Sequence, residues 1–112
     1  MNMASVVVTA NTTPQTAFTV PVNKIGKIKL LEIDNQEASA ITITILDAFT
    51  PTPSASDPSP TPVAVTRKVV TVDAGGLYTE KIDGYIEILG VCQVVASAIG
   101  TNCNITVCYD FE

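Results

Sequence analysis

Ala40-Ile41-Thr42-Ile43-Thr44-Ile45-Leu46 alternates apolar and polar residues from Ile41 to Ile45 without a break. Successive side chains of a β-strand point to opposite faces of its sheet, so the three isoleucines share one face and the two threonines share the other. The stretch therefore predicts a strand whose isoleucine face is buried and whose threonine face lies on the outside.

Runs of similar length and character recur on both sides of this strand, with turn residues between them. We expect strands at residues 5–10, 16–22, 25–34, 40–46, 63–72, 77–82, 85–89, 91–97 and 104–111. Asp83-Gly84 is interpreted as a tight turn, and the change of phase at Leu30-Leu31 as a bulge or as a strand covered on both sides. No connection carries a helical repeat, so the sequence predicts an all-β fold: an antiparallel two-sheet sandwich or jelly roll of about eight strands.

The length of 112 residues fits one domain, which we place at residues 1–112. Residues 50–62 hold five of the seven prolines: Pro51, Pro53, Pro58, Pro60 and Pro62. Proline has no backbone N–H to donate to a sheet, so this segment is expected to be an extended loop. Two interpretations stay open: a flexible insertion, or an interface arm that lies across a neighbouring subunit.

Charged residues make up only 15% of the chain, against about 25% in an average soluble domain. Part of the outside is therefore expected to be covered by other subunits in a homo-oligomer, with a trimer in first place; the alternative is a neutral, Thr/Ser-rich monomer. The net charge of -5 opposes binding to nucleic acid or to an anionic membrane surface.

The sequence shows no pattern typical of a catalytic site. It has no histidine and therefore no Ser-His-Asp or Cys-His pair. We expect a protein that is not an enzyme and that uses no cofactor and no metal. A calcium ion between the scattered turn carboxylates is the lesser alternative. Tyr78, Tyr85 and Tyr109 are interpreted as core or subunit-interface residues rather than as a sugar-binding platform.

Cys92 and Cys108 lie at equal distances from residue 100. A hairpin that turns through residues 98–102 would place the two cysteines opposite each other, where a disulfide could form, and would leave Cys103 unpaired. The alternative is that all three cysteines are small buried hydrophobic residues, because a reducing cytoplasm keeps thiols reduced.

The segments Val70–Gly76, Tyr85–Leu89 and Asn104–Tyr109 form a strand, an Ala-Gly turn and two further strands. This pattern resembles the small β-sandwich virion proteins of tailed bacteriophages, among them head decoration (cement) and minor capsid proteins. The resemblance implies a non-enzymatic protein that binds in many copies to the major capsid protein or other virion subunits, often as trimers at local threefold positions. It would be made in the host cytoplasm and become part of the virion.

Three other functions stay open. The first is a major coat or tail structural protein. The others are a subunit of a surface appendage, located at the cell surface, and a β-sandwich module that binds a carbohydrate or a protein. The sequence shows no basic start followed by a hydrophobic signal core, which disfavours export.

Overall fold

The computed structural model describes residues 3–112, except for the side chains of residues 83–85. The described residues form eight strands: β1 (Ala4–Ala10), β2 (Gln15–Thr19), β3 (Gly26–Asn35), β4 (Ile41–Phe49), β5 (Val63–Val72), β6 (Leu77–Ile88), β7 (Val91–Ala96) and β8 (Gly100–Phe111). The expected all-β fold is confirmed.

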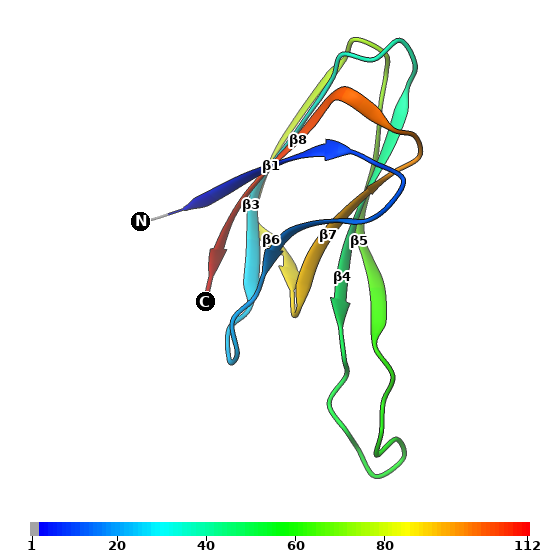
Figure 1. The fold of residues 1–112 in the computed structure, drawn as a ribbon. Helices are drawn as coiled ribbons and strands as arrows, with labels where there is room; N and C mark the ends of the chain where they lie inside the picture. The colour runs from blue at the N-terminus through cyan, green and yellow to red at the C-terminus, as the bar shows by residue number, and fades with distance from the viewer. Residues whose placement is uncertain (1–2) are drawn as a thin grey trace.

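The eight strands form two four-stranded antiparallel sheets, with the orders β1-β8-β3-β6 and β2-β7-β4-β5 (Figure 1). Four of the pairings are nested: β4 with β5, β3 with β6, β2 with β7 and β1 with β8. The chain is thus one long double ribbon rolled over on itself, and the rolling adds the pairs β3–β8 and β4–β7. This topology is the jelly roll, one of the two architectures that the sequence predicts.

The core lies between the sheets and is built from the inward positions of both. Ile41, Ile43 and Ile45 of β4 have exposed fractions of 1–2%, whereas Thr42 and Thr44 lie on the outer face. Ile86 and Ile88 of β6 enter the same apolar cluster from the opposite sheet. The alternation in β4 therefore positions the strand as the sequence predicts.

The strand register tests two predictions, a bulge in β3 and a tight turn in β6, and only the bulge is correct. The bulge expected at Leu30-Leu31 is confirmed, because the pairing of β3 with both of its neighbours shifts between Ile28 and Leu30. The tight turn expected at Asp83-Gly84 is wrong, because the residues on either side of it, 77–81 and 86–88, both pair with β3 in the same antiparallel direction. The extra residues are absorbed where the register jumps from Leu30–Lys81 to Ile28–Ile86, so the chain does not reverse.

Aromatic residues close one end of the core. The rings of Phe18 and Tyr109 stack with their centroids 4.0 Å apart, and Phe111 packs against both rings. Phe18 comes from β2 and Tyr109 from β8, so the cluster joins the two sheets. Tyr78 and Tyr109 are partly buried and pack against the core, whereas the side chain of Tyr85 lies outside the described residues.

The proline-rich segment joins β4 to β5 and extends the hairpin beyond the ends of the other strands (Figure 1). The last ladder pair is Phe49–Val63, and residues 50–62 follow as a projecting loop. We call this loop the arm. Its projection contributes to a longest dimension of 50 Å, against 32 and 18 Å in the other two directions.

Candidate interaction surface

The outer face of the β2-β7-β4-β5 sheet carries no charged side chain among the described residues. Strand register and alternating burial assign thirteen residues to this face. They are Thr16, Thr19, Thr42, Thr44, Leu46, Ala48, Ala64, Thr66, Val69, Thr71, Val91, Gln93 and Val95. We call this surface the uncharged face.

Its polar groups are neutral and partly satisfy one another. The hydroxyls of Thr42 and Thr71 lie 2.9 Å apart across the β4–β5 pair. Val69, beside them on β5, is 55% exposed. A surface of this kind can be covered by another protein without removing a charge from water, which is the costly part of burying a polar surface.

The outer face of the other sheet is different in kind, because charged residues follow one another along β3 and β6. Lys27 forms an ion pair with Glu87, and Lys29 lies 3.5 Å from the carboxylate of Glu112. The hydrogen bond from Lys27 to Glu87 raises the pKa of the lysine. The outer face of this sheet is thus charged, which suits it to water.

The arm belongs to the same sheet as the uncharged face. Pro53, Pro58 and Pro62 are exposed, whereas Pro51 and Pro60 are half-buried. A turn closes the tip of the arm, where the backbone groups of Ser54 and Asp57 bond to each other in both directions, at 2.9 and 3.2 Å. The arm therefore has an ordered tip and solvent-facing prolines, as a contact segment needs, and its role as an interface arm stays a prediction.

A buried carboxylate fixes the end of the sandwich from which the arm projects. Asp47 of β4 is 0% exposed. One oxygen accepts from the Arg67 guanidinium at 2.7 Å and from the Leu89 backbone amide at 2.9 Å, and the other accepts from the Gly90 amide at 3.0 Å. Gly90 has to be glycine, because a Cβ there would lie 2.3 Å from the carbonyl oxygen of Ala48. Asp47 therefore ties the β6–β7 turn to β4.

The interpretation of Asp47 as one of the scattered turn carboxylates is wrong, because Asp47 lies within β4 and is buried. Asp47 continues the inward phase of Ile41, Ile43 and Ile45, and a carboxylate at a core position requires buried donors. Its bonding is complete, and this makes Asp47 a structural residue rather than a catalytic base.

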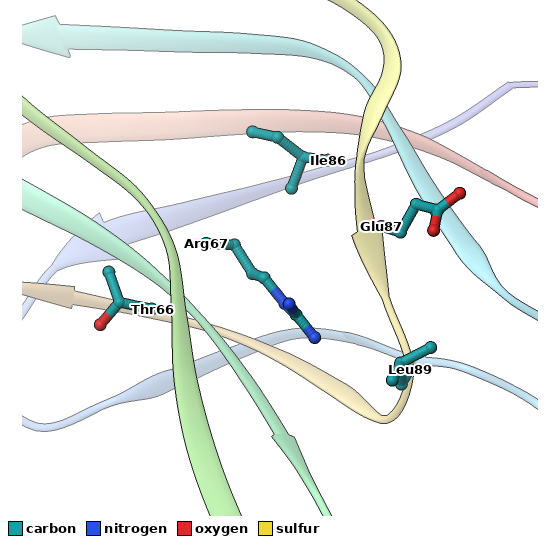
Figure 2. Close-up of a pocket in the computed structure, with 5 residues that line it drawn as sticks. All are labelled: Thr66, Arg67, Ile86, Glu87 and Leu89. Carbon is teal, nitrogen blue, oxygen red and sulfur yellow. The ribbon is translucent and has the colours of Figure 1, made fainter.

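A cleft of about 440 Å³ opens beside this ion pair, between β5 and β6 (Figure 2). It is lined by Thr66, Arg67, Ile86, Glu87 and Leu89, and the Arg67 side chain extends across it toward Leu89. Both charged groups are engaged, Arg67 with Asp47 and Glu87 with Lys27. The lining therefore offers no nucleophile with a base beside it.

The expected hairpin between Cys92 and Cys108 is wrong. Cys92 lies on β7, which pairs with β2 and β4, whereas Cys108 lies on β8, which pairs with β1 and β3. The chain crosses from one sheet to the other between β7 and β8, because both strands have an apolar face to bury and these faces meet across the core. Cys92 points inward from its sheet, whereas Cys108 belongs to the outer phase of its own, opposite Ser5 and Leu30.

All three cysteines are free thiols, and all three are buried. Burial and the nearby charge of Asp47 raise the pKa of Cys92 to about 12. Burial, followed by the charges of Glu37 and Asp34, raises the pKa of Cys103. Thiols held neutral in this way are poor nucleophiles, and their surroundings agree with the alternative interpretation as small buried hydrophobic residues.

Within the described residues no group of three or more His, Cys, Asp or Glu side chains is arranged to hold a metal ion. That part of the chain also has no helix of the length and hydropathy that a membrane span needs. The chain matches no protein-family model and no curated protein sequence.

Proposed function

We propose that this protein is a non-enzymatic structural component of a virion, a capsid decoration (cement) or minor capsid protein that stabilises the shell through subunit contacts. One observation carries the proposal: a sheet face without charge continues into an exposed arm, while the outer face of the other sheet carries charged side chains along β3 and β6.

The two outer faces differ in the free energy needed to bury them. Burying an ion pair such as Lys27–Glu87 removes two charges from water, and their mutual attraction offsets that cost only in good geometry. Covering threonines, valines and alanines has no such penalty and gains about 25 cal/mol for each Å² of apolar surface removed from water. The uncharged face and the arm are therefore assigned to the shell, and the charged sheet to solvent.

A major coat or tail protein is the second candidate, and the jelly-roll topology favours it, since this fold also builds viral capsids. Deletion of the gene separates the two candidates. Loss of a decoration protein leaves assembled shells that break at lower temperature. Loss of a coat protein leaves no shells, and loss of a tail protein leaves heads of normal stability without complete tails.

The first experiment asks where the protein is found. Particles from cultures that carry the gene are purified on a density gradient and probed with an antibody against this chain. We expect the protein to sediment with filled heads at a fixed ratio to the major shell protein. Its recovery only in the soluble fraction would contradict the proposal.

A second experiment tests the assigned surface with particles prepared from the deletion strain. Purified Val69→Lys, which places a charge on the uncharged face, should lose binding to these particles. Leu77→Lys is the matched control, because Leu77 is similarly exposed (65% against 55%) but lies on an edge strand of the other sheet. Equal binding by both variants would exclude the uncharged face as the contact surface.

The oligomeric state belongs to the same proposal. A homo-oligomer, with a trimer in first place, is expected from the low charge of the chain. Light scattering of the purified protein measures its mass directly. A strict monomer that binds no particle would contradict both the oligomer and the decoration role.

A further inference from the structure

Strand β1 is a sheet edge without the usual protection. It lies at one end of the β1-β8-β3-β6 sheet, so one side of its backbone has no neighbouring strand in this sheet. Its seven residues, Ala-Ser-Val-Val-Val-Thr-Ala, contain no charge and no proline, and its pairing with β8 runs without a shift from Ala4 to Thr9. Such an edge offers a row of backbone donors and acceptors to another strand.

The other three edge strands are each interrupted. Strand β2 has five residues, a register shift, and Pro14 directly before it. Strand β5 carries Arg67 and Lys68 at a register shift, and β6 carries Glu80 and Lys81 before a longer one. Charges, prolines and bulges are the devices that keep sheet edges from pairing, and β1 has none of them before its last residue.

The sequence of β1 reads nearly the same in both directions about Val7. An antiparallel copy centred there would place Val7 opposite Val7, Val6 opposite Val8, Ser5 opposite Thr9, and Ala4 opposite Ala10. The faces also match in this register: Val6 and Val8 point toward the core, and Ser5, Val7 and Thr9 point outward. β-branched pairs and Ser–Thr pairs are favourable across antiparallel strands.

We infer that β1 pairs with β1 of a second copy of this chain, about a twofold axis at Val7. The two four-stranded sheets then become one continuous eight-stranded sheet. The contact is isologous, as a twofold axis requires, since each residue meets its counterpart in the other copy.

The incomplete burial of the β1 valines in the single chain supports a second copy of β1 as the pairing partner. Val6 and Val8 point inward yet are only half-buried, and Val7 is 60% exposed. A strand placed alongside would cover the open flank of both inward valines. Strand β1 has no charged residue, so this pairing would bury no charge of the strand. Two copies that each carry a net charge of -5 can therefore approach at this edge without placing like charges opposite each other.

This contact uses a different surface from the one assigned to the shell. The uncharged face belongs to the β2-β7-β4-β5 sheet, whereas β1 is the edge of the other sheet. The inference therefore holds or fails independently of the virion role.

Cross-linking tests the register. In the proposed pair the two Val7 α-carbons lie about 4.5–5.5 Å apart, within the range that a disulfide spans. Under copper–phenanthroline with dissolved oxygen as the oxidant, Val7→Cys should form a covalent dimer that reductant reverses. Leu77→Cys, similarly exposed at the opposite edge of the same sheet, should not form one, and neither should the wild-type protein, whose cysteines are buried.

A charge variant tests the contact without cross-linking. Val7→Lys sets two lysines opposite each other on the axis, so light scattering should show half the wild-type mass. Leu77→Lys should keep the wild-type mass, and circular dichroism checks that both variants are folded.

Three results would overturn the inference. The first is a wild-type mass equal to one chain or to three chains at all accessible concentrations, because a twofold contact builds assemblies with an even number of chains. The second is folded Val7→Lys that keeps the wild-type mass. The third is a failure of Val7→Cys to cross-link above the Leu77→Cys background. If Val7→Lys loses particle binding while its mass is unchanged, the edge receives a strand of another protein and not a second copy.

Discussion

Replacement of Asp47 by alanine is expected to be among the most destabilising changes in this protein. The carboxylate is 0% exposed and accepts from Arg67 and from the backbone amides of Leu89 and Gly90. Alanine accepts none of these bonds. The change therefore leaves three donors without their partner at one point of the structure.

The expected loss of unfolding free energy depends on whether each donor can find another acceptor. The Arg67 side chain is 28% exposed and can turn toward water, so its loss is partly recovered. The two amides belong to the β6–β7 turn held against β4 and have no such freedom. A buried donor left unpaired costs about 1–3 kcal/mol, so the expected loss is about 4 kcal/mol.

Chemical denaturation in urea measures this loss as a change in the free energy of unfolding. Small domains are stable by about 5–15 kcal/mol, so the variant should still fold but should melt roughly 15 °C lower. Glu112→Gln is the control, because it removes the surface pair with Lys29 and should cost less than about 1 kcal/mol.

Hydrogen exchange adds a positional readout, since the amides of Leu89 and Gly90 should lose protection first in Asp47→Ala. The reasoning is refuted if Asp47→Ala costs no more than Glu112→Gln. It is also refuted if stability falls while the two amides keep their protection, since the carboxylate would then act elsewhere.

Ile43→Ala should lose about 2–4 kcal/mol of unfolding free energy from the transfer of three carbons and the cavity left behind, whereas Thr42→Ala should lose less than about 1 kcal/mol; equal losses in urea titrations would mean that the two faces of β4 are wrongly assigned. The raised pKa of Cys92 favours its neutral form in the folded state, so its contribution to stability is complete below pH 9.0 and is lost as the pH rises toward about 12. Urea titrations across this range should show a slope that Cys92→Ala reduces, and an unchanged slope would contradict the burial argument. Replacing residues 50–62 by a four-residue turn should raise stability by about 1 kcal/mol through the shorter loop, and should reduce particle binding if the arm is a contact; a folded variant that binds as the wild type does would remove the arm from the interface.

Much of the fold could be predicted from the sequence, because most strands bury one face in a single core. The alternation at Ile41, Ile43 and Ile45 predicts the strand, its face and its burial. The change of phase at Leu30-Leu31 predicts the bulge. These features follow from periods of two residues, which a single sequence displays directly.

What failed was the inference from local symmetry to spatial pairing. The spacing of Cys92 and Cys108 about residue 100 suits a hairpin, and so does the Asp83-Gly84 dipeptide. Neither hairpin forms, because the partner of each strand is chosen by the whole roll: β7 finds β2 and β4, and β8 finds β1 and β3. Pairings between segments far apart in the chain leave no mark in the spacing of neighbouring residues.

The surfaces were partly accessible from sequence. The low proportion of charged residues predicted that part of the surface is covered. That the uncharged surface lies on one sheet could be found only from the strand register. The near-palindrome of β1 is visible in the sequence, yet it acquires meaning only once β1 is known to be an edge.

The nested order of pairing also determines how the chain can fold. The innermost hairpin, β4 with β5, joins residues separated only by the arm, whereas the outermost ladder brings Ala4 to Tyr109. Closing short loops before long ones loses less chain entropy at each step, so the roll should close from the β4–β5 hairpin outward and should do so slowly for its size. Strand β1 is then the last to dock. Until the two ends of the chain meet, the edge of β8 that receives β1 stays unpaired, and this final step is where aggregation competes with folding.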